Sequence, residues 1–217
     1  SLVDSPTNYG TDTGTGGEVR GNYATWNALA KPRGTLPTFS NGNLQLGANT
    51  GNATILGTIA VSSGKWYWEV TVDTVSDSLI GATSISAALT TNQPGYIADS
   101  AAYLRDGRVK NNGSDVGTYS TYTNGDIIGL ALNMDAGELS FYKNNSLIVK
   151  LTSNISGTWI PTVADFNVGG SALTANFGQR PFAMSGGAPA GYKALCTANL
   201  PTPTILKGSD YFDTKLY

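Results

Sequence analysis

One alternating run of residues constrains the fold of this chain more than any other feature. It covers 64–73, and one face of an extended strand would carry its large apolar side chains, Trp66, Trp68, Val70 and Val72. The opposite face would carry Tyr67, Glu69, Thr71 and Asp73. Two indoles one strand step apart bury a large apolar area, so the run predicts a half-buried strand packed against a second sheet.

The size and composition of the chain favour one all-β domain. Its 217 residues suffice for a single sizeable core, and its 27 glycines suit many short strands joined by tight turns. A formal net charge of −2 is too small to attract nucleic acid or an anionic membrane surface. The longest apolar runs are short and interrupted, so we expect neither a nucleic-acid partner nor membrane insertion.

Missing residue types restrict the chemistry that this chain can perform. It has no histidine, and Cys196 is its one cysteine, so a disulfide within the chain, a thiolate metal cluster and a Ser-His-Asp site are excluded. Three carboxylates lie in separate turns without the spacing of a calcium loop, namely Asp99, Asp106 and Asp115. We therefore expect no cofactor, no metal and no catalytic residues.

Further segments indicate strands and tight hairpins, with a spacing that suits an antiparallel meander. Asp106-Gly107 lies between two short apolar runs, and both residues tolerate positive φ, which predicts a hairpin. Asn144-Asn145 predicts a second hairpin for the same reason. No pattern of long helices is present.

The run 126–134 predicts a central strand. Ile128, Leu130, Leu132 and Met134 fall on one face, whereas small residues, Gly129 and Ala131, occupy the other and allow a neighbouring segment to approach closely. The strongest strand faces together predict a core that contains Trp66, Trp68, Val70, Ile128, Leu130, Leu132 and Phe141.

An ordered set of motifs resembles the SPRY family. The motifs are GKWYWEV at 64–70, IG at 80–81, DG at 106–107, GDIIGLAL at 125–132, GELSFYKN at 137–144 and NFGQRPF at 176–182. The resemblance implies a bent antiparallel two-sheet β-sandwich of the SPRY or concanavalin-like jelly-roll kind. We expect this sandwich over 36–183, an irregular leader packed on it over 1–35, and a C-terminal extension over 184–217 that leads into a further domain.

The flanks of the predicted sandwich resemble segments that border SPRY modules in bacteriophage tail and fibre proteins. These flanking segments are 4–10, 20–27 and 194–203. The resemblance implies a virion protein displayed on the particle surface, with other virion proteins as partners, where it could form a homo-oligomer.

SPRY resemblance also implies recognition without catalysis, through loops at one end of the sandwich. The loop 91–96 and the segment 165–167 are the main candidates, extended by two tyrosines of 117–124. The resulting candidate ligand-binding residues are Asn92, Gln93, Tyr96, Tyr119, Tyr122, Asp165, Phe166 and Asn167. The alternative is that the aromatic rings pack back onto the sandwich as ordinary core.

Three functions are compatible with these observations. The first is an adhesive virion module that binds a host-surface protein or a glycan, since polar loops with an aromatic ring also suit a carbohydrate. The second is a purely architectural module that decorates a capsid or spaces a fibre. The third, a glycan-degrading enzyme on a lectin-like sandwich, is disfavoured because no carboxylate pair lies in one strand pattern.

Overall fold

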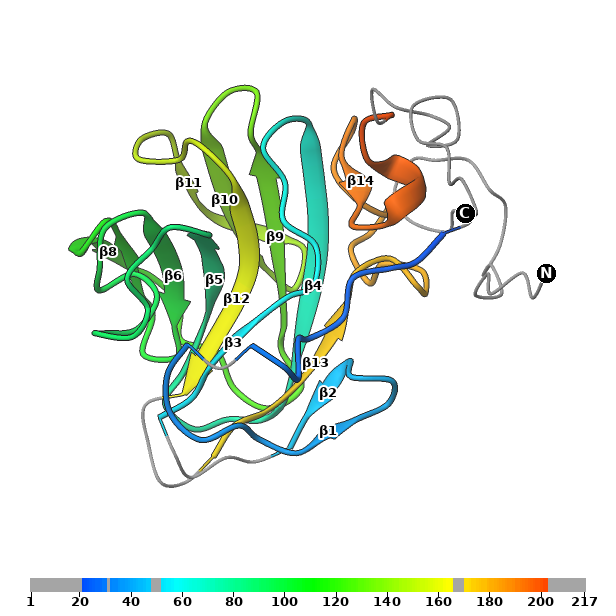
Figure 1. The fold of residues 1–217 in the computed structure, drawn as a ribbon. Helices are drawn as coiled ribbons and strands as arrows, with labels where there is room; N and C mark the ends of the chain where they lie inside the picture. The colour runs from blue at the N-terminus through cyan, green and yellow to red at the C-terminus, as the bar shows by residue number, and fades with distance from the viewer. Residues whose placement is uncertain (1–20, 31, 48–51, 166–169, 203–217) are drawn as a thin grey trace, which may run out of the picture.

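Two β-sheets packed face to face make up the protein in this computed structural model, which describes residues 21–30, 32–47, 52–165 and 170–202 (Figure 1). In spatial order, the eight-stranded sheet contains β1 (Phe39–Ser40), β2 (Gln45–Leu46), β13 (Ala172–Asn176), β4 (Lys65–Thr74), β9 (Ile127–Asn133), β10 (Glu138–Lys143) and β11 (Ser146–Leu151), with β14 (Lys193–Ala194) beside β4. The six-stranded sheet contains β3 (Thr54–Leu56), β12 (Trp159–Asp165), β5 (Ser78–Ser84), β6 (Ser100–Leu104), β7 (Arg108–Asn111) and β8 (Ser114–Thr118).

The strand pairing confirms the predicted all-β sandwich and corrects its expected connectivity. Neighbouring strands pair antiparallel, apart from the short parallel contact of β14 with β4. The sheets do not form a simple meander, because consecutive strands β4 and β5 lie in different sheets. Within the described residues, the helical content is a single 3₁₀ turn, Thr197–Asn199, and no helix has the length and hydropathy of a membrane span.

The core between the sheets contains every side chain that the strand faces predicted. Each of the seven is 2% exposed or less: Trp66, Trp68, Val70, Ile128, Leu130, Leu132 and Phe141. Trp68 and Leu130 stand opposite each other in the register of β4 with β9, so the apolar faces of these two strands form one continuous surface. Trp26 also enters this core, and its ring meets Phe177 edge-on with ring centroids 5.3 Å apart.

The outer face of β4 is buried at Tyr67 and Glu69 and exposed at Asp73, so the expectation of a half-buried strand fails over part of its length. Residues 182–194 lie on this face, beside β4 in Figure 1, and the ring of Phe182 packs edge-on against Tyr67 with centroids 4.9 Å apart. The predicted close approach at β9 is confirmed, because the hydroxyl of Tyr67 lies over Gly129, where a Cβ atom would collide with it. The alternation within β4 could not predict that residues 182–194, much later in the sequence, would bury part of its outer face.

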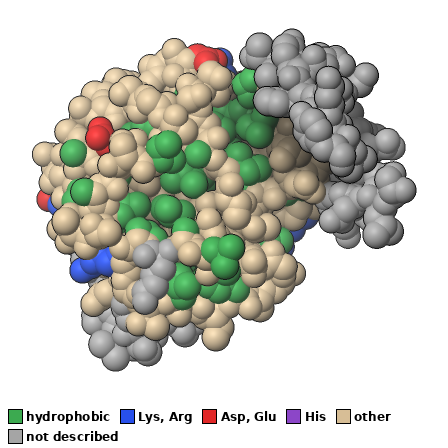
Figure 2. Space-filling view, viewed as in Figure 1, with side chains coloured by type: hydrophobic (Ala, Val, Ile, Leu, Met, Phe, Trp, Pro, Cys, Tyr) green, Lys and Arg blue, Asp and Glu red, His purple; other side chains and the backbone are tan. Residues whose placement is uncertain are grey.

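The exposed surface reflects the low charge of the chain. Figure 2 shows few acidic or basic side chains on the face that it presents, and its apolar side chains form small groups between polar ones. Two ion pairs, Arg105–Asp77 and Arg108–Asp106, instead lie at one end of the six-stranded sheet, where β5 begins and β6 ends.

Candidate functional site

The candidate site begins at the tight turn that joins β6 to β7. Gly107 has a φ of 91°, and its amide donates to the carbonyl of Leu104 over 3.0 Å, as the Asp-Gly motif predicted. The carboxylate of Asp106 accepts hydrogen bonds from the backbone amide of Arg108 at 3.1 Å and from its Nε at 2.7 Å. The turn therefore holds one carboxylate and one guanidinium group together at the end of the sheet.

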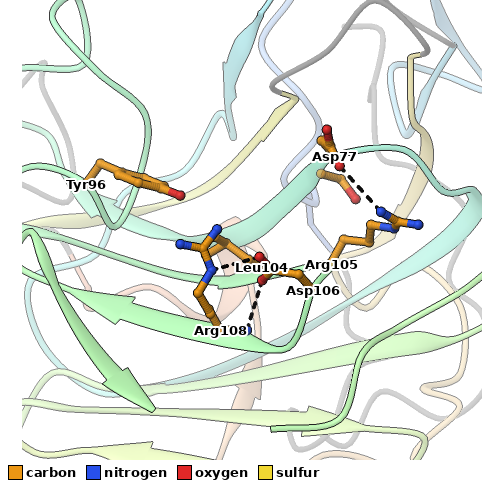
Figure 3. Close-up of a pocket in the computed structure, with 7 residues that line it drawn as sticks. Asp77, Tyr96, Leu104, Arg105, Asp106 and Arg108 are labelled. Carbon is orange, nitrogen blue, oxygen red and sulfur yellow. Dashed lines mark hydrogen bonds and ion pairs between the residues drawn. The ribbon is translucent and has the colours of Figure 1, made fainter. Parts of the chain in front are cut away.

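A pocket of about 410 Å³ opens beside this turn (Figure 3). Its lining consists of Asp77, Ser78, Tyr96, Leu104, Arg105, Asp106 and Arg108. Figure 3 shows Tyr96 on one side and the Arg105–Asp77 pair on the other, with Asp106 and Arg108 between them. The pocket thus combines an aromatic ring, an aliphatic side chain and charged groups of both signs.

Two ion pairs in the pocket are available to a ligand. Arg105 Nη1 lies 3.5 Å from a carboxylate oxygen of Asp77, and the side chains of both pairs are between 39% and 49% exposed. Exposed pairs of this kind contribute only about 0–1 kcal/mol each. The hydrogen bond to Asp106 raises the pKa of Arg108, so this side chain stays charged. A ligand can therefore exchange these contacts for its own at little cost.

Tyr96 is fixed in place by contacts from β7. The Nζ atom of Lys110 lies 4.4 Å from the centre of the tyrosine ring, within cation–π range, and 2.6 Å from a carboxylate oxygen of Asp115. This ion pair lowers the pKa of Asp115. The ring also packs on an apolar group on the outer face of the six-stranded sheet, formed by Leu79, Ala102, Leu104 and Ala164. Tyr96 is thus a preorganised aromatic wall.

Three of the polar residues predicted around Tyr96 make hydrogen bonds within the protein. Gln93 is fully buried, and its Nε2 donates to the backbone carbonyl of Asp165 at 3.1 Å. The carboxylate of Asp165 accepts the amide of Ser171 at 2.5 Å, and the Oδ1 of Asn92 accepts the amide of Gln93 at 2.9 Å. These bonds tie the loop to the end of β12. Phe166 and Asn167 lie outside the described residues.

The two tyrosines after β8 follow the alternative prediction, in which aromatic rings pack back onto the sandwich. Tyr122 is 1% exposed, its hydroxyl donates to the carbonyl of Ser78 at 2.7 Å, and its ring packs edge-on against Tyr103. Tyr119 is half-buried against the main core, and its amide donates to the carbonyl of Gly107 at 2.7 Å. Tyr122 is therefore a core residue, and Tyr119 packs beside the turn without lining the pocket.

The sequence did not predict that charged residues line the pocket. The sequence identifies Asp106 only as a turn residue, and its patterns predict no ligand-binding role for Asp77, Arg105 or Arg108. The run Arg105-Asp106-Gly107-Arg108 offered a usable signal, since two arginines flank a predicted tight turn and must emerge at the same end of a hairpin.

Comparison with known proteins agrees with this architecture. Residues 65–180 match the family model described as SPRY domain, which is more than half of the sequence, and the chain belongs to that family. The SPRY domain of human HERC1 aligns with a TM-score of 0.56 at 21% identity, covering 66% of this chain and 93% of that one. The TRIM65 PSpry domain aligns with a TM-score of 0.58 at 16% identity, covering 71% and 92%. At these identities the structures establish the fold.

A curated relative is the dual specificity protein kinase splA of Dictyostelium discoideum. It is 40% identical over 75 residues, which amount to 35% of this chain and only 3% of the kinase. SPRY domains are typically protein-interaction modules and are generally non-catalytic. In the described ranges, no group of three or more Cys, Asp or Glu side chains is placed to hold a metal ion.

Proposed function

We propose that this protein is a non-catalytic recognition module that binds a segment of a partner protein in the pocket between Tyr96 and Arg105. The observation that carries the proposal is the pocket itself: about 410 Å³ in volume, with an immobilised aromatic wall and two exposed arginine–aspartate pairs. Its size lies within the range of ligand-binding pockets, and arginine and tyrosine are enriched where binding energy concentrates.

The chemistry of the pocket favours a polypeptide over a glycan. Guanidinium and carboxylate groups together can pair with backbone amides, side-chain carboxylates and side-chain amides of an extended peptide. A sugar needs a free aromatic face for stacking, and the Lys110 ammonium group lies over the ring of Tyr96. A glycan remains the second candidate ligand because the pocket is rich in hydrogen-bonding groups.

For the biological setting, we propose a bacteriophage virion, in which the module contacts a host-surface protein. The flanking segments that resemble those of tail and fibre proteins support this setting. An architectural role in the same particle is the alternative, and it requires no ligand in the pocket. Mass spectrometry of purified particles, combined with binding of the isolated protein to host cells, separates these two roles.

The binding proposal is tested by selecting ligands from a random peptide library with the purified protein. Affinities of the selected peptides are then compared between the wild type and Arg105→Ala or Arg108→Ala. We expect each variant to bind at least about tenfold more weakly, as for a lost charge-assisted hydrogen bond.

Lys150→Ala is the matched control, because Lys150 is a comparably exposed cation in a single ion pair with Glu138, on the other sheet. It should bind like the wild type. Selected peptides that bind both arginine variants as tightly as the wild type would show that this pocket is not the peptide-binding site. Selection of glycans but no peptides from parallel arrays would favour the second candidate.

A further inference from the structure

A second hollow lies on the outer face of the eight-stranded sheet, away from the pocket described above. Its volume is about 120 Å³, the space of about four water molecules in the liquid. Strands β4, β9 and β10 supply Tyr67, Glu69, Ile127, Gly129 and Tyr142 to its lining. The turn after β10 supplies Asn144 and Asn145, and the covering segment, residues 182–194 on the outer face of β4, supplies Ala183 and Met184. The strand register sets Glu69, Gly129 and Tyr142 in one row across the sheet.

Glu69 gives this hollow a buried negative charge. The residue is 2% exposed, and its carboxylate accepts the backbone amides of Ala183 and Met184, each at 2.9 Å. The Tyr67 hydroxyl at 3.2 Å and the Asn176 Nδ2 at 3.4 Å are longer contacts to the same carboxylate. All four partners donate to it, which is the pattern of an ionised carboxylate.

Among the described residues, no cation lies opposite the Glu69 carboxylate in this hollow. No lysine or arginine lines the hollow, and in the described part of the chain the four hydrogen-bond donors to Glu69 are all neutral. Neutral donors stabilise a buried carboxylate but leave its negative charge uncompensated. The site is therefore electrostatically complementary to a positively charged group.

Two tyrosines make the walls of the hollow suitable for an ammonium group. Tyr67 is immobilised by Phe182, and its hydroxyl reaches over Gly129, while Tyr142 is half-buried near the opening. Aromatic rings attract ammonium groups, and the hydroxyl and amide oxygens of the lining can accept their protons. The volume admits the end of an alkylammonium chain, and the exposed turn at Asn144 and Asn145 leaves the rest of a ligand outside.

We propose that this hollow is a second binding site, which receives the primary ammonium end of a lysine side chain from a partner protein. The ammonium group would replace the longer contacts of Glu69 and leave its two backbone bonds in place. This inference is independent of the pocket at Arg105, and it assigns the covering segment a binding role in addition to its packing role.

The test is a titration of the ¹⁵N-labelled protein with Nα-acetyl-lysine methylamide, followed by NMR. The backbone amides of Ala183 and Met184 report on the site because both donate to Glu69. We expect saturable shifts of these amides with the lysine probe, and no such shifts with its Nε-acetylated form, which has the same chain without the charge. A parallel titration with butylammonium shows whether the hollow binds a simple alkylamine in place of a lysine side chain.

Three variants complete the design. Glu69→Gln should weaken binding at least about tenfold, and Tyr142→Leu should weaken it severalfold without touching a bond to Glu69. Glu138→Gln is the matched control, a carboxylate on the same face of the same sheet that pairs with Lys150, and it should bind like the wild type. If Glu69→Gln loosens the covering segment, its weaker binding has a structural cause. Tyr142→Leu and the acetylated probe then test whether the hollow binds the ammonium group.

Several results would overturn the second site. They are an absence of shifts at Ala183 and Met184 at saturating probe, equal shifts with the acetylated probe, or unchanged affinity in Tyr142→Leu. Binding of butylammonium without binding of the lysine probe would reject a lysine side chain as the ligand. Arg105→Ala should leave all of these titrations unchanged, so failure here does not affect the proposed peptide pocket.

Discussion

Replacing single tryptophans by phenylalanine tests how the sandwich core is held together. Trp68 and Trp159 are both buried, at 1% and 0% exposure, but their indole N–H groups differ. Trp159 Nε1 donates to the carbonyl of Ser156 at 2.8 Å, whereas Trp68 Nε1 is a buried donor with no hydrogen-bond partner among the described residues. A buried donor left unpaired costs about 1–3 kcal/mol, and Trp68→Phe removes that donor.

Both substitutions remove a similar volume of core and so incur a similar cavity cost. Trp159→Phe also breaks a hydrogen bond and leaves the carbonyl of Ser156 to find another partner. We therefore expect Trp68→Phe to lower the free energy of unfolding by about 1–3 kcal/mol less than Trp159→Phe. Trp68→Ala, which deletes the ring, should cost about 3–5 kcal/mol, a large part of a domain's stability.

Urea unfolding with linear extrapolation measures these differences, provided that the slope m stays the same among the variants. Trp68→Phe that costs as much as Trp159→Phe would refute the assignment of an unpaired indole. Trp68→Ala that costs under about 1 kcal/mol would refute the position of this side chain in the core.

Three further predictions concern a loop, a turn and a wall of the pocket. Although burial favours its neutral form, bonds from the Thr123 amide, Asn144 and Lys143 lower the pKa of Asp126. The stability from this charge is present above the ordinary pKa of about 3.9 and is lost as the pH falls through the lower folded value, so Asp126→Asn should flatten the acid limb of a stability–pH profile. Gly107→Ala should cost more than about 1 kcal/mol in urea unfolding, because φ is 91° and the new Cβ would collide with the carbonyl of Tyr119. Tyr96→Leu should weaken selected peptides severalfold in a titration, with a melting temperature that stays close to that of the wild type.

The fold was largely predictable because its signal is local. Alternation over 64–73 and 126–134 identified two strands that pair directly, and buried residues such as Trp68 and Leu130 follow from the apolar faces alone. The connectivity was not predictable, since nothing in β4 or β5 indicates that they join different sheets. The burial of Glu69 depends on Ala183, 114 residues later in the chain, and no local pattern carries that information.

The candidate site was only partly predictable. Tyr96 is predicted from the SPRY resemblance of the loop 91–96, and it does line the pocket. Gln93 and Asp165 have the residue types of ligand-binding groups, but their hydrogen bonds to the protein itself are invisible in the sequence. Arg105 and Arg108 have the residue type of solvated groups beside a turn, and only the hairpin predicted at Asp106-Gly107 indicates that they converge.

The most direct test of the recognition role is hydrogen–deuterium exchange of the protein with and without a selected peptide. Binding of the peptide in the pocket predicts slower exchange at the lining, in the segments around Ser78, Tyr96 and 104–108. Protection there, lost in the Arg105→Ala variant, is the expected result. Protection confined to the edge strands β8 or β11, with no change around Tyr96 and 104–108, would contradict binding of the peptide in this pocket.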